Sequence, residues 1–246
     1  MKKVGLMLKF LLFSVILGLM ISSAAVADLY WESDQETKGM PGRPDETKVI
    51  KTYLTSYASR TEREGQITIM NFDTKIMYHI NPQAKTYQQI NMAEMGKPPE
   101  IKDEKGQMQQ QMMKNMMGNI QVTPTQETRQ IAGYNCQKYL VSGMMMNSDY
   151  WLSKDVKGYE ELKEIGKKVT TIFDENPMMK QMNIAGMMGQ LDGFPVQMVM
   201  NIMKGTSTTT LKKIEKKSLD KSLFSVPEGY TQTQSKMPMM FNQNGK

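Results

Sequence analysis

The chain has 246 residues and a formal net charge of +6 at pH 7, from 31 lysines and arginines against 25 acidic residues. The basic residues are scattered along the sequence, which argues against a nucleic-acid partner. The chain holds one histidine, His79, and one cysteine, Cys136, so it cannot form an intramolecular disulfide and gives little support for catalytic or zinc sites built on these residues. We therefore predict that the protein is not an enzyme and needs no cofactor.

The first 27 residues have the pattern of a cleaved signal peptide. Three lysines fall within the first nine residues, an apolar run follows at residues 10–21, and Ala25-Val-Ala27 has the small-x-small form that signal peptidase cleaves. The run is short for a membrane span, which needs about 20 apolar residues; an uncleaved N-terminal anchor is the alternative. Removal of residues 1–27 lowers the formal charge to +3, because three lysines and no acidic residue leave. We expect a soluble periplasmic protein that begins at Asp28.

The segment from residue 28 to residue 92 follows a β-strand pattern broken by turns. Its predicted strands are 28–33, 49–54, 66–72, 76–80 and 86–92, and a turn with two glycines and two prolines occupies residues 38–44. Asp73-Thr-Lys75 and Asn81-Pro-Gln-Ala-Lys85 form short turns between the last three strands. Short strands joined by turns of this length predict an antiparallel meander.

Two helical regions interrupt the strands in the rest of the chain. Residues 105–118 place five methionines on one face of an amphipathic helix. A second helical region spans residues 155–190 and is interrupted at Pro177. The remaining strand candidates are 120–130, 135–146, 148–152, 196–203, 207–217 and 223–226.

These elements predict a mainly β fold with helical insertions, of the α+β class. A sheet of this many strands must twist and curl, so we expect a curled antiparallel half-barrel covered by methionine-rich helices. Residues 28–231 form a single domain in this interpretation, followed by a flexible polar tail at 232–246. Such a layer of helices over a curled sheet either packs solid or leaves a cavity.

Six phrases of the sequence carry a resemblance: Asp28-Leu-Tyr-Trp-Glu-Ser33, Gly39-Met-Pro-Gly42, Ile131-Ala-Gly-Tyr-Asn-Cys-Gln-Lys-Tyr139, Tyr150-Trp-Leu-Ser-Lys-Asp155, Gly193-Phe-Pro-Val196 and Leu223-Phe-Ser-Val-Pro-Glu-Gly-Tyr230. Together they resemble an exported bacterial family of unknown function that is similar in pattern to the LolA/LolB-like lipoprotein-carrier superfamily. The resemblance implies a half-open antiparallel barrel with helices in its mouth and, in the better-known relatives, a hydrophobic cavity for acyl chains. It implies no catalytic residue. The methionine content and the long helical insertions differ from the carriers, so the resemblance does not assign a ligand.

The chain contains 27 methionines, of which only Met1, Met7 and Met20 precede residue 28. Three interpretations fit the others. Methionine fills irregular space in a protein core, so these residues are core in the first interpretation. In the second they form an adaptable apolar surface for acyl chains or for a partner's hydrophobic segment. In the third, their thioethers bind a soft metal ion such as Cu(I) or Ag(I).

The second interpretation gives the predicted function: an exported, non-catalytic carrier that holds a lipid or a lipoprotein acyl chain between the sheet and the helices. Its predicted ligand-binding residues are Met108, Met112, Met113, Met116, Met117, Trp151, Met178, Met179, Met182 and Phe194. Its predicted partners are the hydrophobic ligand or a lipoprotein and a transient envelope protein. The alternatives are a periplasmic Cu(I)- or Ag(I)-binding protein and a structural envelope protein with a solid core.

Overall fold

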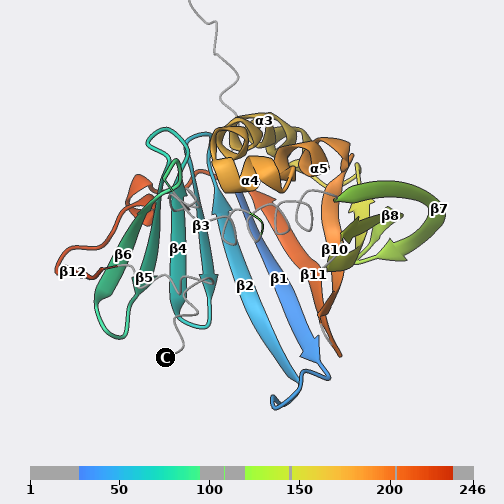
Figure 1. Ribbon diagram of the computed structural model, residues 1–246, viewed down its shortest axis with the longest axis horizontal. Helices are drawn as coiled ribbons and strands as arrows, with labels where there is room; N and C mark the ends of the chain where they lie inside the picture. The colour runs from blue at the N-terminus through green and yellow to red at the C-terminus, as the bar shows by residue number, and fades with distance from the viewer. Residues whose placement is uncertain (1–27, 95–107, 109–119, 144–145, 203, 235–246) are drawn as a thin grey trace, which may run out of the picture.

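The computed structural model describes residues 28–94, 108, 120–143, 146–202 and 204–234, and these form one curled sheet with helices at one end (Figure 1). The strands are β1 (Leu29–Lys38), β2 (Glu46–Leu54), β3 (Ala58–Arg63), β4 (Gln66–Asn71), β5 (Ile76–Asn81), β6 (Thr86–Asn91), β7 (Gln121–Ile131), β8 (Tyr134–Gly143), β9 (Met146–Ser153), β10 (Phe194–Ile202), β11 (Gly205–Lys216) and β12 (Thr231–Gln232). The helices are α3 (Tyr159–Glu175), α4 (Pro177–Gln181), α5 (Ile184–Gln190) and the short 3-10 helix η1 (Lys221–Phe224).

The strands follow the order β12-β6-β5-β4-β3-β2-β1-β11-β10-β9-β8-β7. Neighbours are antiparallel, except that β12 pairs with β6 in parallel. Two meanders of sequence-adjacent strands, β1 to β6 and β7 to β11, are therefore joined where β1 pairs with β11. This long-range pairing makes one continuous sheet, and the mainly β, curled antiparallel architecture predicted from the sequence is confirmed.

Local sequence explains the hairpins between β4 and β6. The Asn71 side-chain oxygen accepts hydrogen bonds from the backbone N–H groups of Asp73 and Thr74, at 3.0 and 2.9 Å. Lys75 and Lys85 close the two turns with positive φ angles of 57° and 49°. An asparagine that caps its own turn and a left-handed residue at the end of the turn are ordinary features of short hairpin loops.

The helices cover one face of the sheet at one end, which we name the inner face (Figure 1). Helix α3 begins after Gly158, whose φ of 103° favours glycine and whose Cβ, if present, would lie 2.6 Å from a Leu29 methyl carbon. Pro177 opens α4, so the predicted interruption of the helical region is confirmed. Helix α3, whose Tyr159, Ile165 and Ile172 belong to the core, contains no methionine.

Two clusters of buried side chains join α3 to the sheet. One contains Leu29, Leu54, Phe72, Met92, Ile165 and Ile172, and the other Cys136, Trp151, Val156, Tyr159, Phe194, Val196 and Leu211. Trp31 and Leu162 contact both clusters. The helix is therefore an integral part of the core.

The opposite, outer face of strands β3 to β6 is covered by the C-terminal segment. Leu219 and Phe224 of that segment pack with Ala58, Ile69 and Ile80 of the sheet. β12 then adds to the edge of β6. Strands β4 and β5 consequently carry packed side chains on both faces.

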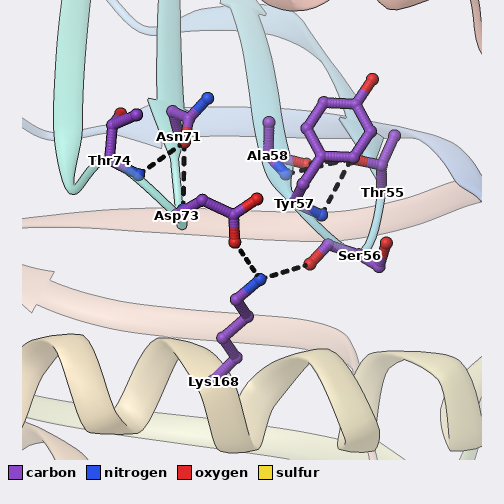
Figure 2. Close-up of polar contacts among 8 residues, drawn as sticks. All are labelled: Thr55, Ser56, Tyr57, Ala58, Asn71, Asp73, Thr74 and Lys168. Carbon is purple, nitrogen blue, oxygen red and sulfur yellow. Dashed lines mark hydrogen bonds and ion pairs between the residues drawn. The ribbon is translucent and has the colours of Figure 1, made fainter.

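Polar contacts fix α3 to two turns of the sheet (Figure 2). The Lys168 ammonium donates a hydrogen bond to the Ser56 carbonyl oxygen at 3.2 Å and forms an ion pair with Asp73. The turn that carries Ser56 is itself closed by Thr55, whose hydroxyl accepts from the Ala58 N–H at 3.0 Å. One lysine of the helix thus holds the β2–β3 turn and the β4–β5 turn together.

Candidate functional site

Two of the predicted ligand-binding side chains, Trp151 and Phe194, lie in the core. They are 6% and 1% exposed. The Phe194 ring meets the Trp31 ring edge to face, with centroids 5.7 Å apart. The Arg129 guanidinium lies over the Trp151 ring at 4.0 Å from its centroid. The described contacts of both rings are with protein side chains, and their predicted role in ligand binding stays a prediction.

The predicted methionines differ in whether the structure describes them and in how exposed they are. Met112, Met113, Met116 and Met117 lie outside the described residues. Met108 is described and is 68% exposed. Met178 lies in α4, and Met179 and Met182 nearby are partly buried. The structure therefore does not bring the predicted set together within its described part, and the methionine-rich helical cover stays a prediction.

The strand register identifies a different set of residues that share the inner face. Leu211 of this face packs in the cluster that contains Tyr159 of α3. Because side chains two residues apart on a strand share a face, the inner face continues from Leu211 along β11 to Thr209 and Ser207, whose partners on β10 are Met198 and Met200. It forms two cross-strand rows: Tyr139, Tyr150, Met198, Thr209, Gln35 and Lys48; and Val141, Ser148, Met200, Ser207, Thr37 and Glu46.

In both rows the side chains change from mainly apolar to polar between β10 and β11. The members on β8, β9 and β10 are aromatic, aliphatic or thioether side chains with one serine, and we name these six residues the inner patch: Tyr139, Val141, Ser148, Tyr150, Met198 and Met200. The members on β11, β1 and β2 are hydroxyl, amide or charged side chains. An apolar surface and a polar surface therefore meet on one face of one sheet.

Burial within the inner patch is graded. Val141, Ser148 and Tyr139 are 1%, 3% and 8% exposed, whereas Tyr150, Met198 and Met200 are partly exposed. Burial raises the pKa of Tyr150, which keeps its phenol neutral. An uncharged surface with flexible thioethers at its exposed positions suits an apolar ligand of variable shape.

Ser148 has an additional property. Its hydroxyl oxygen is buried and has no hydrogen-bond partner in the part of the chain that the structure describes. Buried polar groups are nearly always paired, so such a group needs an explanation.

A hollow on another part of the sheet has the opposite chemical character. It is a shallow, open hollow of about 360 Å³ near the β3–β4 turn, with Lys51, Arg60, Glu62 and Arg63 among its lining residues. Charged side chains in an open hollow are unsuited to an apolar ligand. The inner patch is therefore the stronger candidate site.

The described residues offer no arrangement for metal or acid–base chemistry that rivals the inner patch. Among them, no group of three or more His, Cys, Asp or Glu side chains is placed to hold a metal ion. His79 lies at the surface, with its Nδ1 3.1 Å from the Thr68 hydroxyl, and burial lowers its pKa. Cys136 is 1% exposed and burial raises its pKa, so its thiolate is disfavoured. Among the described helices, none is long and apolar enough to cross a membrane.

Sequence reasoning missed the inner patch, although its signal is present. Met198-Val-Met200 and Ser148-Asp-Tyr150 each alternate with period two within a strand. The pattern shows that each pair shares a face, but which face each strand presents depends on the pairing of β8, β9 and β10. The irregularity between Pro195 and Gln197 further hides that relation.

Comparison with known proteins gives one family match. Residues 43–230 match the family described as "Domain of unknown function (DUF4412)". No curated protein matches the chain.

Several solved structures match the chain at low identity and with low TM-scores. PNGF-II is 16% identical with a TM-score of 0.42, and the match covers 86% of this chain but only 32% of PNGF-II. The LolA superfamily protein NE2245 from Nitrosomonas europaea is 7% identical with a TM-score of 0.35, over 81% of this chain and 90% of that one. A putative outer membrane lipoprotein-sorting protein domain from Vibrio parahaemolyticus is 8% identical with a TM-score of 0.36, over 82% and 91%. Similarity at this level carries no functional information.

Proposed function

The chain belongs to the DUF4412 family of unknown function, and on that premise we propose that it is an exported, non-catalytic binding protein that holds a hydrophobic ligand on the inner patch. The ligand class is a lipid or an acyl chain. The periplasm is the proposed location, because residues 1–27 have the pattern of a signal peptide. The family match confirms the membership of a family of unknown function that the six sequence phrases indicated.

One observation carries the proposal: Tyr150, Met198 and Met200 are partly exposed on the inner face, the face that packs against α3 at its other end. Each methylene of a ligand that these side chains shield from water contributes about 0.8 kcal/mol. A chain of several methylenes would therefore bind without any polar contact. Met179 and Met182 are proposed to contribute from the helical side.

No described contact favours the alternative of Cu(I) or Ag(I) binding. Four of the predicted methionines lie outside the described residues. Met198 and Met200 share a face, but among the described residues they face tyrosine, serine and threonine across the strands, with no further thioether. A structural envelope protein remains the outcome if no ligand binds.

The test is fluorescence of 1-N-phenylnaphthylamine, an apolar probe, with delipidated full-length mature protein. We expect the wild type to bind the probe and the double variant Met198→Gln/Met200→Gln to bind at least tenfold more weakly, because burial of an apolar side chain is worth about 1.5–3 kcal/mol. Val199→Gln is the matched control: Val199 lies between the two methionines on the opposite face. Equal weakening by both variants, or no binding by the wild type, would contradict the proposal.

Native mass spectrometry of the protein purified from its own periplasm gives a second readout. We expect co-purified lipid on the wild type and less on the double variant. Val199→Gln should carry as much lipid as the wild type.

A further inference from the structure

The Ser148 hydroxyl is a buried polar group without a partner among the described residues. The side chain is 3% exposed, and its oxygen makes no hydrogen bond with that part of the chain. Directly across the ladder lie Val141 on one side and Met200 on the other. An aliphatic side chain cannot accept its proton, and a thioether accepts weakly. A buried hydroxyl left unpaired costs about 1–3 kcal/mol, and a hydrogen-bonding group on a ligand would remove this cost.

The surroundings of Ser148 restrict that group to a neutral one. None of the six residues of the inner patch carries a charge at neutral pH, because burial favours the neutral phenol of Tyr150. The nearest charged members of the two rows, Lys48 and Glu46, lie on β2, three strands beyond β10. A carboxylate or phosphate placed beside Ser148 would lack a counter-ion in an apolar setting, which is strongly unfavourable.

We propose that the Ser148 hydroxyl donates a hydrogen bond to the carbonyl oxygen of an acyl ester, whose hydrocarbon chain lies over Met198 and Met200. The ligand class is then an acyl ester, in preference to a plain hydrocarbon or a free fatty acid. This inference rests on the proposed function, because it places the ester on the inner patch. Ser148 acts as a specificity-determining residue in this arrangement.

Competition for the bound naphthylamine probe tests the inference. Methyl decanoate supplies the ester and undecane the matched hydrocarbon, and their affinity ratio is measured in wild type, Ser148→Ala and Ser142→Ala. Ser142 is the control, since it is an exposed serine of β8 outside the inner patch. We expect Ser148→Ala to lower the ester-to-hydrocarbon ratio about three- to tenfold, the usual range for one buried hydrogen bond. Because the ratio is compared between variants, the difference in water solubility of the two compounds cancels.

Stability of the ligand-free protein provides an independent readout. Removing an unpaired buried hydroxyl leaves no partner behind, so Ser148→Ala should unfold at the same urea concentration as the wild type or at a higher one. A clear loss of stability would show that the hydroxyl already has a role in the fold and would overturn the inference.

The outcomes separate this inference from the proposed function. If both compounds bind and the ratio is unchanged by Ser148→Ala, the ester contact is wrong while the apolar site stands. If neither compound displaces the probe, both proposals fail. An acyl ester can come from a phospholipid or from an acylated protein, so dihexanoyl phosphatidylcholine and a diacylglyceryl-cysteine peptide form two further arms. The compound whose affinity falls in Ser148→Ala identifies the source of the ester. If Ser148→Ala changes the affinity for neither compound, the inference is contradicted.

Discussion

The two halves of the inner face are both built from antiparallel strands, but their side chains differ in chemistry. From β8 to β10 the cross-strand rows consist of tyrosine, valine, methionine and one serine, and from β11 to β2 they consist of hydroxyl, amide and charged side chains. The second half adjoins strands β3 to β6, where side chains of β4 and β5 pack with α3 on the inner face and the C-terminal segment packs on the outer face. The first half keeps apolar side chains partly exposed.

This difference indicates a division of roles along one sheet. Buried aliphatic contacts and polar contacts with turns hold the region around α3. The inner patch retains apolar side chains that the described part of the fold does not fully bury. A fold that needed only stability would place polar residues at such positions, as it does in the same rows from β11 onwards. The contrast is the physical basis for the proposed binding site.

The largest expected effect is on the free energy of unfolding, and it distinguishes one buried residue of α3 from one residue of the inner patch. Ile172 on α3 is 4% exposed in the cluster beneath the helix, and its replacement by alanine should lower the free energy of unfolding by about 2–5 kcal/mol. Met198→Ala, at a partly exposed position of the inner patch, should cost only about 1 kcal/mol. Urea unfolding at pH 7 measures both. Equal losses would show that the two regions are equally packed and would remove the contrast.

Much of the local structure could be predicted from the sequence. The hairpins of β4 to β6 were predicted because Asp73-Thr-Lys75 and Asn81-Pro-Gln-Ala-Lys85 are short turn segments between strand patterns. The helical interruption was predicted because proline cannot continue a helix. These features depend on residues that are close in the chain, so a single sequence contains the necessary information.

The candidate site could not be predicted to the same extent. The pairing of β1 with β11 joins residues nearly two hundred positions apart, and no local pattern encodes it. Trp151 and Phe194 were expected to line a cavity, but an aromatic residue on a strand has the same local pattern whether it meets a ligand or another ring. Only the neighbours Trp31 and Arg129 place them in the core.

A smaller effect is expected from the contact between α3 and the two turns in Figure 2. Lys168→Ala removes the ion pair with Asp73 and the hydrogen bond to Ser56, and it should lower the unfolding free energy by about 0.5–1 kcal/mol, since both charges are exposed. Lys167→Ala is the control, because Lys167 pairs only within the helix, with Glu164 at 2.7 Å. The excess loss in Lys168→Ala should shrink in 1 M NaCl, where the screening length is about 3 Å. An excess that does not depend on salt would assign the effect to the hydrogen bond with Ser56 alone.

The smallest effect concerns Asp192, which follows α5 and links it to the start of α3. Its carboxylate forms an ion pair with Lys154 and accepts a hydrogen bond from the Tyr159 hydroxyl at 2.6 Å. These two contacts hold the pKa of Asp192 below the ordinary value of 3.8. Since a lowered pKa means that folding favours the ionised form, the contribution is present above pH 3.8 and is lost as the pH falls through the lowered pKa.

Asp192→Asn should therefore be less stable than the wild type near neutral pH, and the two unfolding free energies should converge as the pH falls below 3.8. Urea unfolding between pH 2.5 and 7 measures the difference. In a Lys154→Ala background the effect of Asp192→Asn should be smaller, because the main cause of the lowered pKa is gone. A difference that stayed constant with pH would show that Asp192 acts through packing. In that case α5 would be held to α3 without a charge, and the helices beside the inner patch would belong to the rigid part of the fold.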